Sequence, residues 1–237
     1  MLMLHAGAEA IEASALPDVP MPAATKSHHP IAHHDVVQMV KFSLGFHGHE
    51  ITEEHHGIMP DGLRYFGLLT LKSAHGDYTH TVGLRNSNDK SWPIGIAFGS
   101  RVFVCDNTAF TGEKVIKRRH TANAKRDLPA LVAEAIEPLH EARLAMSQQY
   151  NRFKAAELGD YQADAAIMQM YRDGVINVQR IANVANAWDN PPHDWGDKTA
   201  WRLFNAATYA MIGRVAEDPR STQKLHEVVD GICTRLN

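Results

Sequence analysis

The sequence predicts an α+β fold, in which an antiparallel β-meander of four to five strands is followed by a helical C-terminal half. Two observations carry this prediction. Strand-like runs gather between residues 63 and 106, and helical spacing of apolar residues begins after Asp127. Because strands and helices form separate blocks rather than alternating, α+β is favoured over α/β. The predicted organisation is a mobile arm over 1–30 and a single α+β domain over 31–237, with the sheet over 60–118 and the helical region over 127–236.

The N-terminal segment has the composition of an arm. Residues 1–30 are rich in alanine, proline and small polar residues, which favours mobility over a continuous element. A helix is predicted immediately afterwards, over residues 35–44, where Val36, Val40 and Leu44 recur at helical spacing.

The strands of the meander are predicted from apolar and aromatic runs. Tyr78 begins a segment that alternates apolar and polar residues with a period of two. Gly99-Ser100 separates two later apolar runs and predicts a tight two-residue hairpin. The polar loop Asn86–Ser91 admits two interpretations, a plain hairpin loop or a loop that donates hydrogen bonds to phosphate or sugar. The predicted strands are 63–73, 78–86, 92–98 and 101–106.

Proline, glycine and aspartate divide the C-terminal half into helices. Pro138 should kink or split the first helix, which starts at Asp127. Gly159 should end it, and Asp160 should start the next. Asp197 is the expected cap of a later helix. The last two helices are predicted over 198–216 and 219–235.

The bulk composition is that of an ordinary globular protein. The chain has 237 residues, 44% hydrophobic and 22% charged, with a net charge of -3. No apolar run approaches the roughly 18 residues of a membrane span, and the first charged residues, Glu9 and Glu12, are unlike the basic start of a secretory signal. Two cysteines give no disulfide framework. We therefore expect a cytoplasmic protein with no membrane partner.

Positive charge is concentrated directly after the meander. Between residues 113 and 126 the only acid is Glu113. Such a strip can neutralise phosphates, with Trp92 available for stacking, or it can be a solvated loop. The candidate nucleic-acid-binding residues are Arg85, Lys90, Arg101, Lys114, Lys117, Arg118, Arg119, Lys125 and Arg126.

Histidine is abundant, with 15 residues, several of them paired between His28 and His56. Imidazole binds zinc, nickel or copper, but no H-E-x-x-H motif or cysteine pair accompanies these residues. A polar, pH-sensitive surface is the favoured interpretation. Asp106 and Asn107 could hold Mg²⁺, although a turn after the strand is the simpler explanation. We predict no catalytic residue, no metal ligand and no cofactor.

Three stretches resemble a known family: GLRNSNDKSWPIGIAFGSRVFVCDN (83–107), the helical region 127–158 and DKTAWRLFNAATYAM (197–211). They are similar to the DUF932-type proteins of prophages and plasmids, a family known only as a domain of unknown function. The resemblance implies a mobile-element context, with a role in DNA metabolism or host–phage conflict. The order of elements is also similar to that of single-strand annealing proteins, which form rings; this is an analogy of fold alone.

The leading expectation is a non-enzymatic protein that binds single-stranded DNA in recombination or replication. A protein-interaction or anti-defence module that engages a host protein is the alternative, and a metal-dependent hydrolase is a third. The sequence leaves self-association open.

Overall fold

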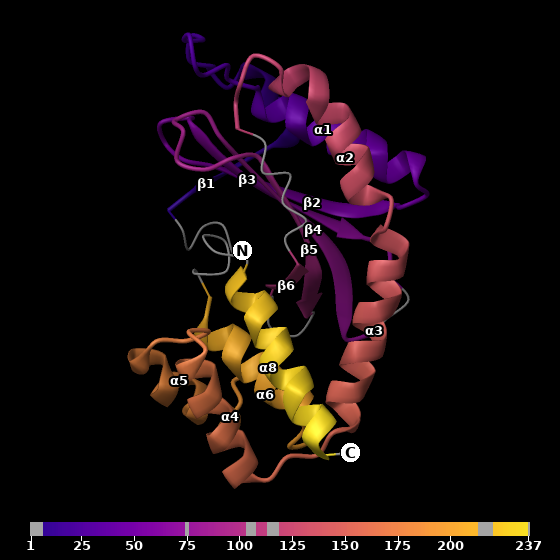
Figure 1. Ribbon diagram of the computed structural model, residues 1–237, viewed down its shortest axis with the longest axis vertical. Coiled ribbons are helices and arrows are strands. Elements are labelled where there is room, and N and C mark those ends of the chain that lie inside the picture. Colours follow the sequence, from indigo (N-terminus) through magenta and orange to yellow (C-terminus); the bar gives the residue numbers. More distant parts are fainter. Residues whose placement is uncertain (1–6, 74–75, 103–107, 113–118, 213–219, 237) are drawn as a thin grey trace.

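The computed structural model describes residues 7–73, 76–102, 108–112, 119–212 and 220–236 (Figure 1). The elements of the N-terminal half are β1 (Glu9–Ile11), η2 (Ala13–Asp18), α1 (His33–Phe46), β2 (Ile51–Ile58), β3 (Arg64–Leu71), β4 (Tyr78–Ser87), β5 (Gly95–Val102) and β6 (Thr108–Gly112). The elements of the C-terminal half are α2 (Ala124–Ile136), α3 (Leu139–Ala155), α4 (Asp160–Arg172), α5 (Val178–Asp189), α6 (Ala200–Ala210) and α8 (Arg220–Leu236).

The sheet is an antiparallel meander followed by helices, so the predicted α+β class is confirmed. Six strands lie in the order β1-β2-β3-β4-β5-β6, and each pairs antiparallel with its chain neighbour. β1 and β2 lie outside the predicted sheet range of 60–118.

β2 is a strand that the sequence analysis did not predict. Its sequence, ITEEHHGI, is charged rather than apolar. The charges have partners on other elements, because Glu54 pairs with Lys41 of α1 at 2.7 Å and Glu53 pairs with Arg101 of β5 at 2.5 Å. Tertiary ion pairs thus support a strand that has little local signal of its own.

The predicted hairpin at Gly99-Ser100 is wrong. β5 runs straight through both residues, with Gly99 opposite Thr81 and Ser100 opposite His80 of β4. Ser100 is buried, and its hydroxyl lies 2.5 Å from the hydroxyl of Tyr150 on α3. The small size of Gly99 and Ser100 therefore leaves room for a side chain of α3 and does not mark a turn. Most of the strand predicted over 101–106 falls outside the described residues.

One hydrophobic core lies between the sheet and the helix pair α1 and α2, which lie side by side across the sheet (Figure 1). Val36 and Val40 of α1 and Val132 of α2 are buried here against β3 and β4. Leu16, in the predicted arm, and Ile31, directly after it, belong to the same core, so the arm packs against the domain at Leu16.

A second core fills the helical half. Tyr150 and Phe153 of α3 are fully buried against Phe204 of α6 and against α8. Tyr78 of β4 joins this core through an edge-on contact with Tyr150, at a ring distance of 5.0 Å. Because α3 runs from the level of the sheet into the helical half, it connects the two cores (Figure 1).

Most predicted helix boundaries hold. Pro138 separates α2 from α3, and Gly159 precedes α4. Thr199, rather than the predicted Asp197, caps α6, because its side chain accepts a hydrogen bond from the backbone N–H of Arg202. Within the described ranges, no helix combines the length and apolar character needed to cross a membrane.

Candidate anion-binding site

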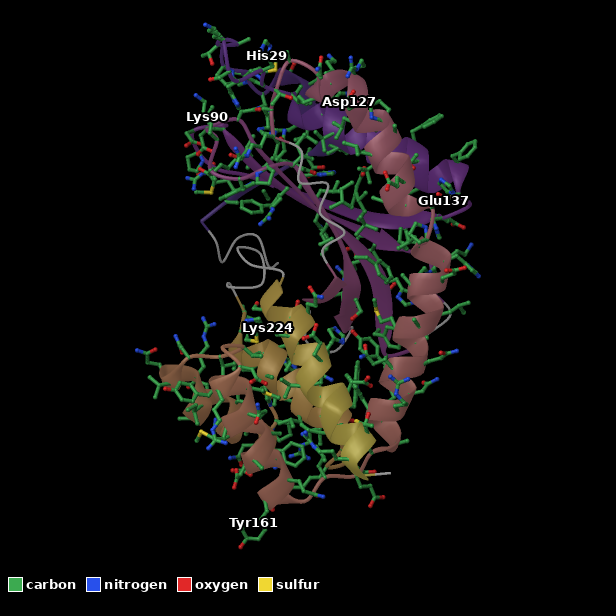
Figure 2. The ribbon with its side chains drawn as sticks, in the orientation of Figure 1. His29, Lys90, Asp127, Glu137, Tyr161 and Lys224 are labelled. Carbon is green, nitrogen blue, oxygen red and sulfur yellow. The ribbon has the colours of Figure 1, made fainter. Side chains whose placement is uncertain are left out.

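Three distant chain segments meet around a cavity of about 480 Å³. They are the segment before α1, the loop between β4 and β5, and the segment before α2. The lining residues are Ser27, His28, Lys90, Ser91, Trp92, Pro93, Arg119, His120 and Thr121. Lys90 lies at the same end of the molecule as His29, far from the helical tip marked by Tyr161 (Figure 2).

Buried asparagines hold the first wall of this cavity in place. The side chain of Asn88 accepts a hydrogen bond from the Ile31 N–H and donates one to the Ile31 carbonyl, both at 3.2 Å. Asn86 donates to the same carbonyl at 2.9 Å. The His28 ring lies 3.0 Å from the Asn88 carbonyl, and the His29 N–H donates to the carbonyl of His120 at 2.8 Å. The segment before α1 is therefore fixed to both other walls.

The loop Asn86–Ser91 is both scaffold and cavity wall. Asp89 accepts hydrogen bonds from the Ser87 hydroxyl at 2.5 Å and from the Ser91 N–H at 2.9 Å. Partial burial alone would raise the pKa of Asp89, but these hydrogen bonds and nearby Arg64 outweigh it and lower the pKa. The carboxylate is thus occupied within the loop, while Lys90 and Ser91 are exposed on the cavity wall.

The cavity wall is positively charged. Lys90 and Arg119 contribute two cations, and no aspartate or glutamate is among the lining residues that the structure describes. Among the described residues, neither cation has a carboxylate within ion-pair distance. Since cations without a counter-charge attract anions, this wall suits an anionic group.

Buried donors add to the same wall. His120 is only 4% exposed, and neither of its ring nitrogens has a hydrogen-bond partner of good geometry. Burial first, and then the neighbouring His28 ring at 5.1 Å, lower the pKa of His120 to about 4, against an opposing effect of the His29 backbone. The indole N–H of Trp92 is buried too and has no hydrogen-bond partner among the described residues. Buried polar atoms cost free energy unless they are hydrogen bonded, so the unpartnered ring of His120 favours a polar ligand in this cavity.

The other candidate cations that the structure describes do not line this cavity. Arg101 pairs with Glu53 on β2 and lines a different cavity. The remaining described candidates lie as follows: Arg85 lies across Gly95, Lys125 pairs with Asp35 at 3.2 Å, and Arg126 pairs with Asp127 at 2.8 Å. Lys114, Lys117 and Arg118 lie outside the described residues.

The histidines are less exposed than the sequence predicts. The prediction of a polar surface is wrong for His28, His33, His49 and His56, which are buried. His33 illustrates their role, because one ring nitrogen lies 3.0 Å from the Gly62 carbonyl and the other 2.9 Å from the Asn86 amide. In the part of the chain that the structure describes, no three histidine, cysteine or acidic side chains gather as a metal site.

A family model described as a domain of unknown function, DUF932, matches residues 22–228. The chain belongs to the DUF932 family. All three walls of the cavity fall within the matched residues of this DUF932 protein, whereas β1 precedes them. Comparisons with curated proteins and with solved structures gave no match.

The sequence predicted two of the lining residues, Lys90 and Arg119, as nucleic-acid-binding candidates, Trp92 as a stacking face, and Ser91 as part of a loop that could donate to phosphate. It did not place His28 and His120 beside them. The structure instead packs the Trp92 ring against Phe66, at 5.5 Å, and under Arg64, at 5.8 Å.

Proposed function

We propose that this DUF932 protein binds nucleic acid, single-stranded DNA first of all, through the cavity between Lys90 and Arg119. The observation that carries the proposal is a pair of cations on a cavity wall whose described residues include no carboxylate. A phosphate backbone is the most abundant polyanion that such a wall meets in a cell. A cavity of about 480 Å³ has the size of a small-ligand pocket, so it suits a nucleotide of a flexible strand better than a rigid duplex.

The role that this binding supports is that of an accessory protein of a phage, plasmid or integrative element, acting in recombination or replication in the cytoplasm. The resemblance of residues 83–107 to proteins of mobile elements supports this context. Self-association on the strand belongs to the same proposal, and light scattering with and without DNA would measure it.

The test is binding of a fluorescent single-stranded oligonucleotide over a range of salt concentrations. We expect log affinity to fall linearly with log salt, and Arg119→Ala to reduce the slope by about 0.7, the value for one phosphate contact on a single strand. Arg172→Ala is the matched control, because Arg172 is exposed at the end of α4 in the helical half. An absence of binding at low salt would rule out the proposal.

A second candidate function, a protein-interaction module, is favoured by a separate observation. Phe42 and Phe46 lie one helical turn apart on α1 and are 77% and 78% exposed. Exposed aromatic side chains are enriched where proteins dock. Co-purification of a stoichiometric partner that is lost with Phe42→Ala and Phe46→Ala, but kept with Arg119→Ala, would favour this function.

A further inference from the structure

We infer that the cavity between Lys90 and Arg119 receives a phosphomonoester, the phosphorylated end of a strand or a nucleotide, rather than the phosphodiester of a strand interior. The inference rests on the proposed function for the presence of a nucleic-acid strand. The cavity residues alone indicate a phosphate group.

The charge of the wall is the first reason. A phosphomonoester carries about -1.5 to -2 charges at neutral pH and presents three acceptor oxygens, whereas an internal phosphodiester carries one charge. Lys90 and Arg119 supply two positive charges, and the described lining residues include no acid that would neutralise either. Two cations match the doubly charged group.

The second reason is the number of donors. Ser91 lines the same cavity as the two cations and carries a hydroxyl donor. His120, another lining residue, adds an imidazole that is almost fully buried and has no hydrogen-bond partner of good geometry among the described residues. A terminal phosphate has three free oxygens for such a set, and charge-assisted hydrogen bonds to it are stronger than those between neutral groups.

The third reason is the fixed position of the cavity walls. They come from three segments that hydrogen bond to one another, through Asn88 to Ile31 and through His29 to His120. The interior of a strand would have to continue past the phosphate on both sides. A wall that is held by these bonds is costly to displace, so a chain end is the better occupant.

The experiment compares three fluorescent oligonucleotides of one sequence: a 5′-phosphate, a 3′-phosphate, and hydroxyls at both ends. The full-length protein should bind one phosphorylated form about tenfold more tightly than the hydroxyl form, as expected for one additional hydrogen bond to a charged group. Lys90→Gln and Arg119→Gln should abolish the preference. Lys224→Gln and Arg172→Gln, which change exposed cations in the helical half, should keep it. Circular dichroism verifies that every variant is folded.

Competition separates the sources of the phosphate. Inorganic phosphate that displaces the oligonucleotide supports recognition of the phosphate alone, and displacement by a nucleoside monophosphate only supports recognition of a whole nucleotide. Equal affinity for all three oligonucleotides, or a preference that survives both Gln substitutions, would overturn the inference and leave nucleic-acid binding intact. Binding of phosphate without binding of any oligonucleotide would instead overturn the proposed function and retain the phosphate site.

Discussion

At the scale of single residues, Lys90 combines an unusual backbone conformation with a positive charge on the cavity wall. Among the described residues other than glycine, it alone has a positive φ, 71°. A side chain with a Cβ costs roughly 1–2 kcal/mol in this region, and glycine avoids that cost. The hydrogen bonds of Asp89 to Ser87 and Ser91 hold the turn in this conformation. Strain of this kind gathers at binding sites, in agreement with the place of Lys90 on the cavity wall.

Substitution of Lys90 separates its backbone role from its charge. Lys90→Gly should leave the free energy of unfolding unchanged or raise it by up to about 1 kcal/mol, because the left-handed strain disappears. Lys90→Val should lower it by about 1–2 kcal/mol, because a β-branched residue fits this region poorly. Both should weaken oligonucleotide binding equally, since both remove the ammonium group. Urea denaturation and binding titrations measure the two effects, and equal stability of the two variants would contradict the strained turn.

At the scale of elements, the cavity depends on one side chain that joins two of them. Asn88, at the end of β4, makes two hydrogen bonds to the backbone of Ile31, 57 residues away and just before α1. It carries no charge and is not among the residues that line the cavity. Its contribution to binding would therefore come from the placement of the segment that carries His28.

Asn88→Ala should lower the free energy of unfolding by about 1–3 kcal/mol, because the backbone N–H of Ile31 loses its partner in a buried place. Oligonucleotide affinity should fall several-fold at conditions where the variant is fully folded, while the salt slope stays unchanged because both cations remain. Asn190→Ala, which changes an exposed asparagine at the end of α5, is the control. A reduced salt slope for Asn88→Ala would mean that the cations themselves have moved.

The contact between β5 and α3 can be tested by a double-mutant cycle. Burial raises the pKa of Tyr150 well above its usual value, against a lowering by Ser100, so its hydroxyl stays protonated. Ser100→Ala should cost about 1–3 kcal/mol because the Tyr150 hydroxyl then has no partner. Tyr150→Phe in the same chain should recover part of this loss, because no orphaned hydroxyl remains. Additive losses in the double variant would show that the hydrogen bond contributes nothing.

The helical half could be predicted because its signals are local. Pro138 removes a backbone donor and Gly159 directly precedes the helix that starts at Asp160, so each break is visible in a short window of sequence. β2 and the course of β5 could not be predicted, because they depend on distant partners. Glu53 is paired by Arg101, and Ser100 is small because Tyr150 lies over it.

The candidate site shows the same contrast between local signals and distant partners. Lys90 and Arg119 could be named from charge alone, since they lie in a basic stretch and a polar loop. Their association with His28 and His120 required knowledge of which chain segments meet. The hydrogen bonds of Asn86 and Asn88 hold these segments together. In a sequence, however, these two asparagines are typical of an ordinary turn.

At the scale of the whole molecule, buried histidines link both cores and the cavity to pH. Burial lowers the pKa of His33 at the start of α1, of His56 on β2, and of His120 beside the cavity. His226 on α8 is also buried, and its ring stacks on Tyr150 at 5.6 Å and lies 4.7 Å from Phe204. Burial lowers the pKa of His226 to about 3. Each of these rings is therefore held neutral by the fold.

This arrangement predicts a loss of stability in mild acid. Above pH 6.5 His226 is neutral in both the folded and the unfolded chain, so its effect on stability is constant. Below pH 6.5 the unfolded chain takes up a proton that the folded chain refuses until about pH 3. Stability therefore falls as pH falls, by about 2 kcal/mol at pH 5 for this one residue.

His226→Phe should flatten the pH dependence of the free energy of unfolding between pH 7 and pH 5, because Phe fills the aromatic cluster without a titratable group. His140→Gln, at an exposed histidine of α3, should keep the dependence of the parent protein. Urea denaturation at both pH values measures the difference. If His226→Phe loses as much stability between pH 7 and pH 5 as the parent does, His226 is already protonated in the fold or its proton uptake is compensated elsewhere in the core.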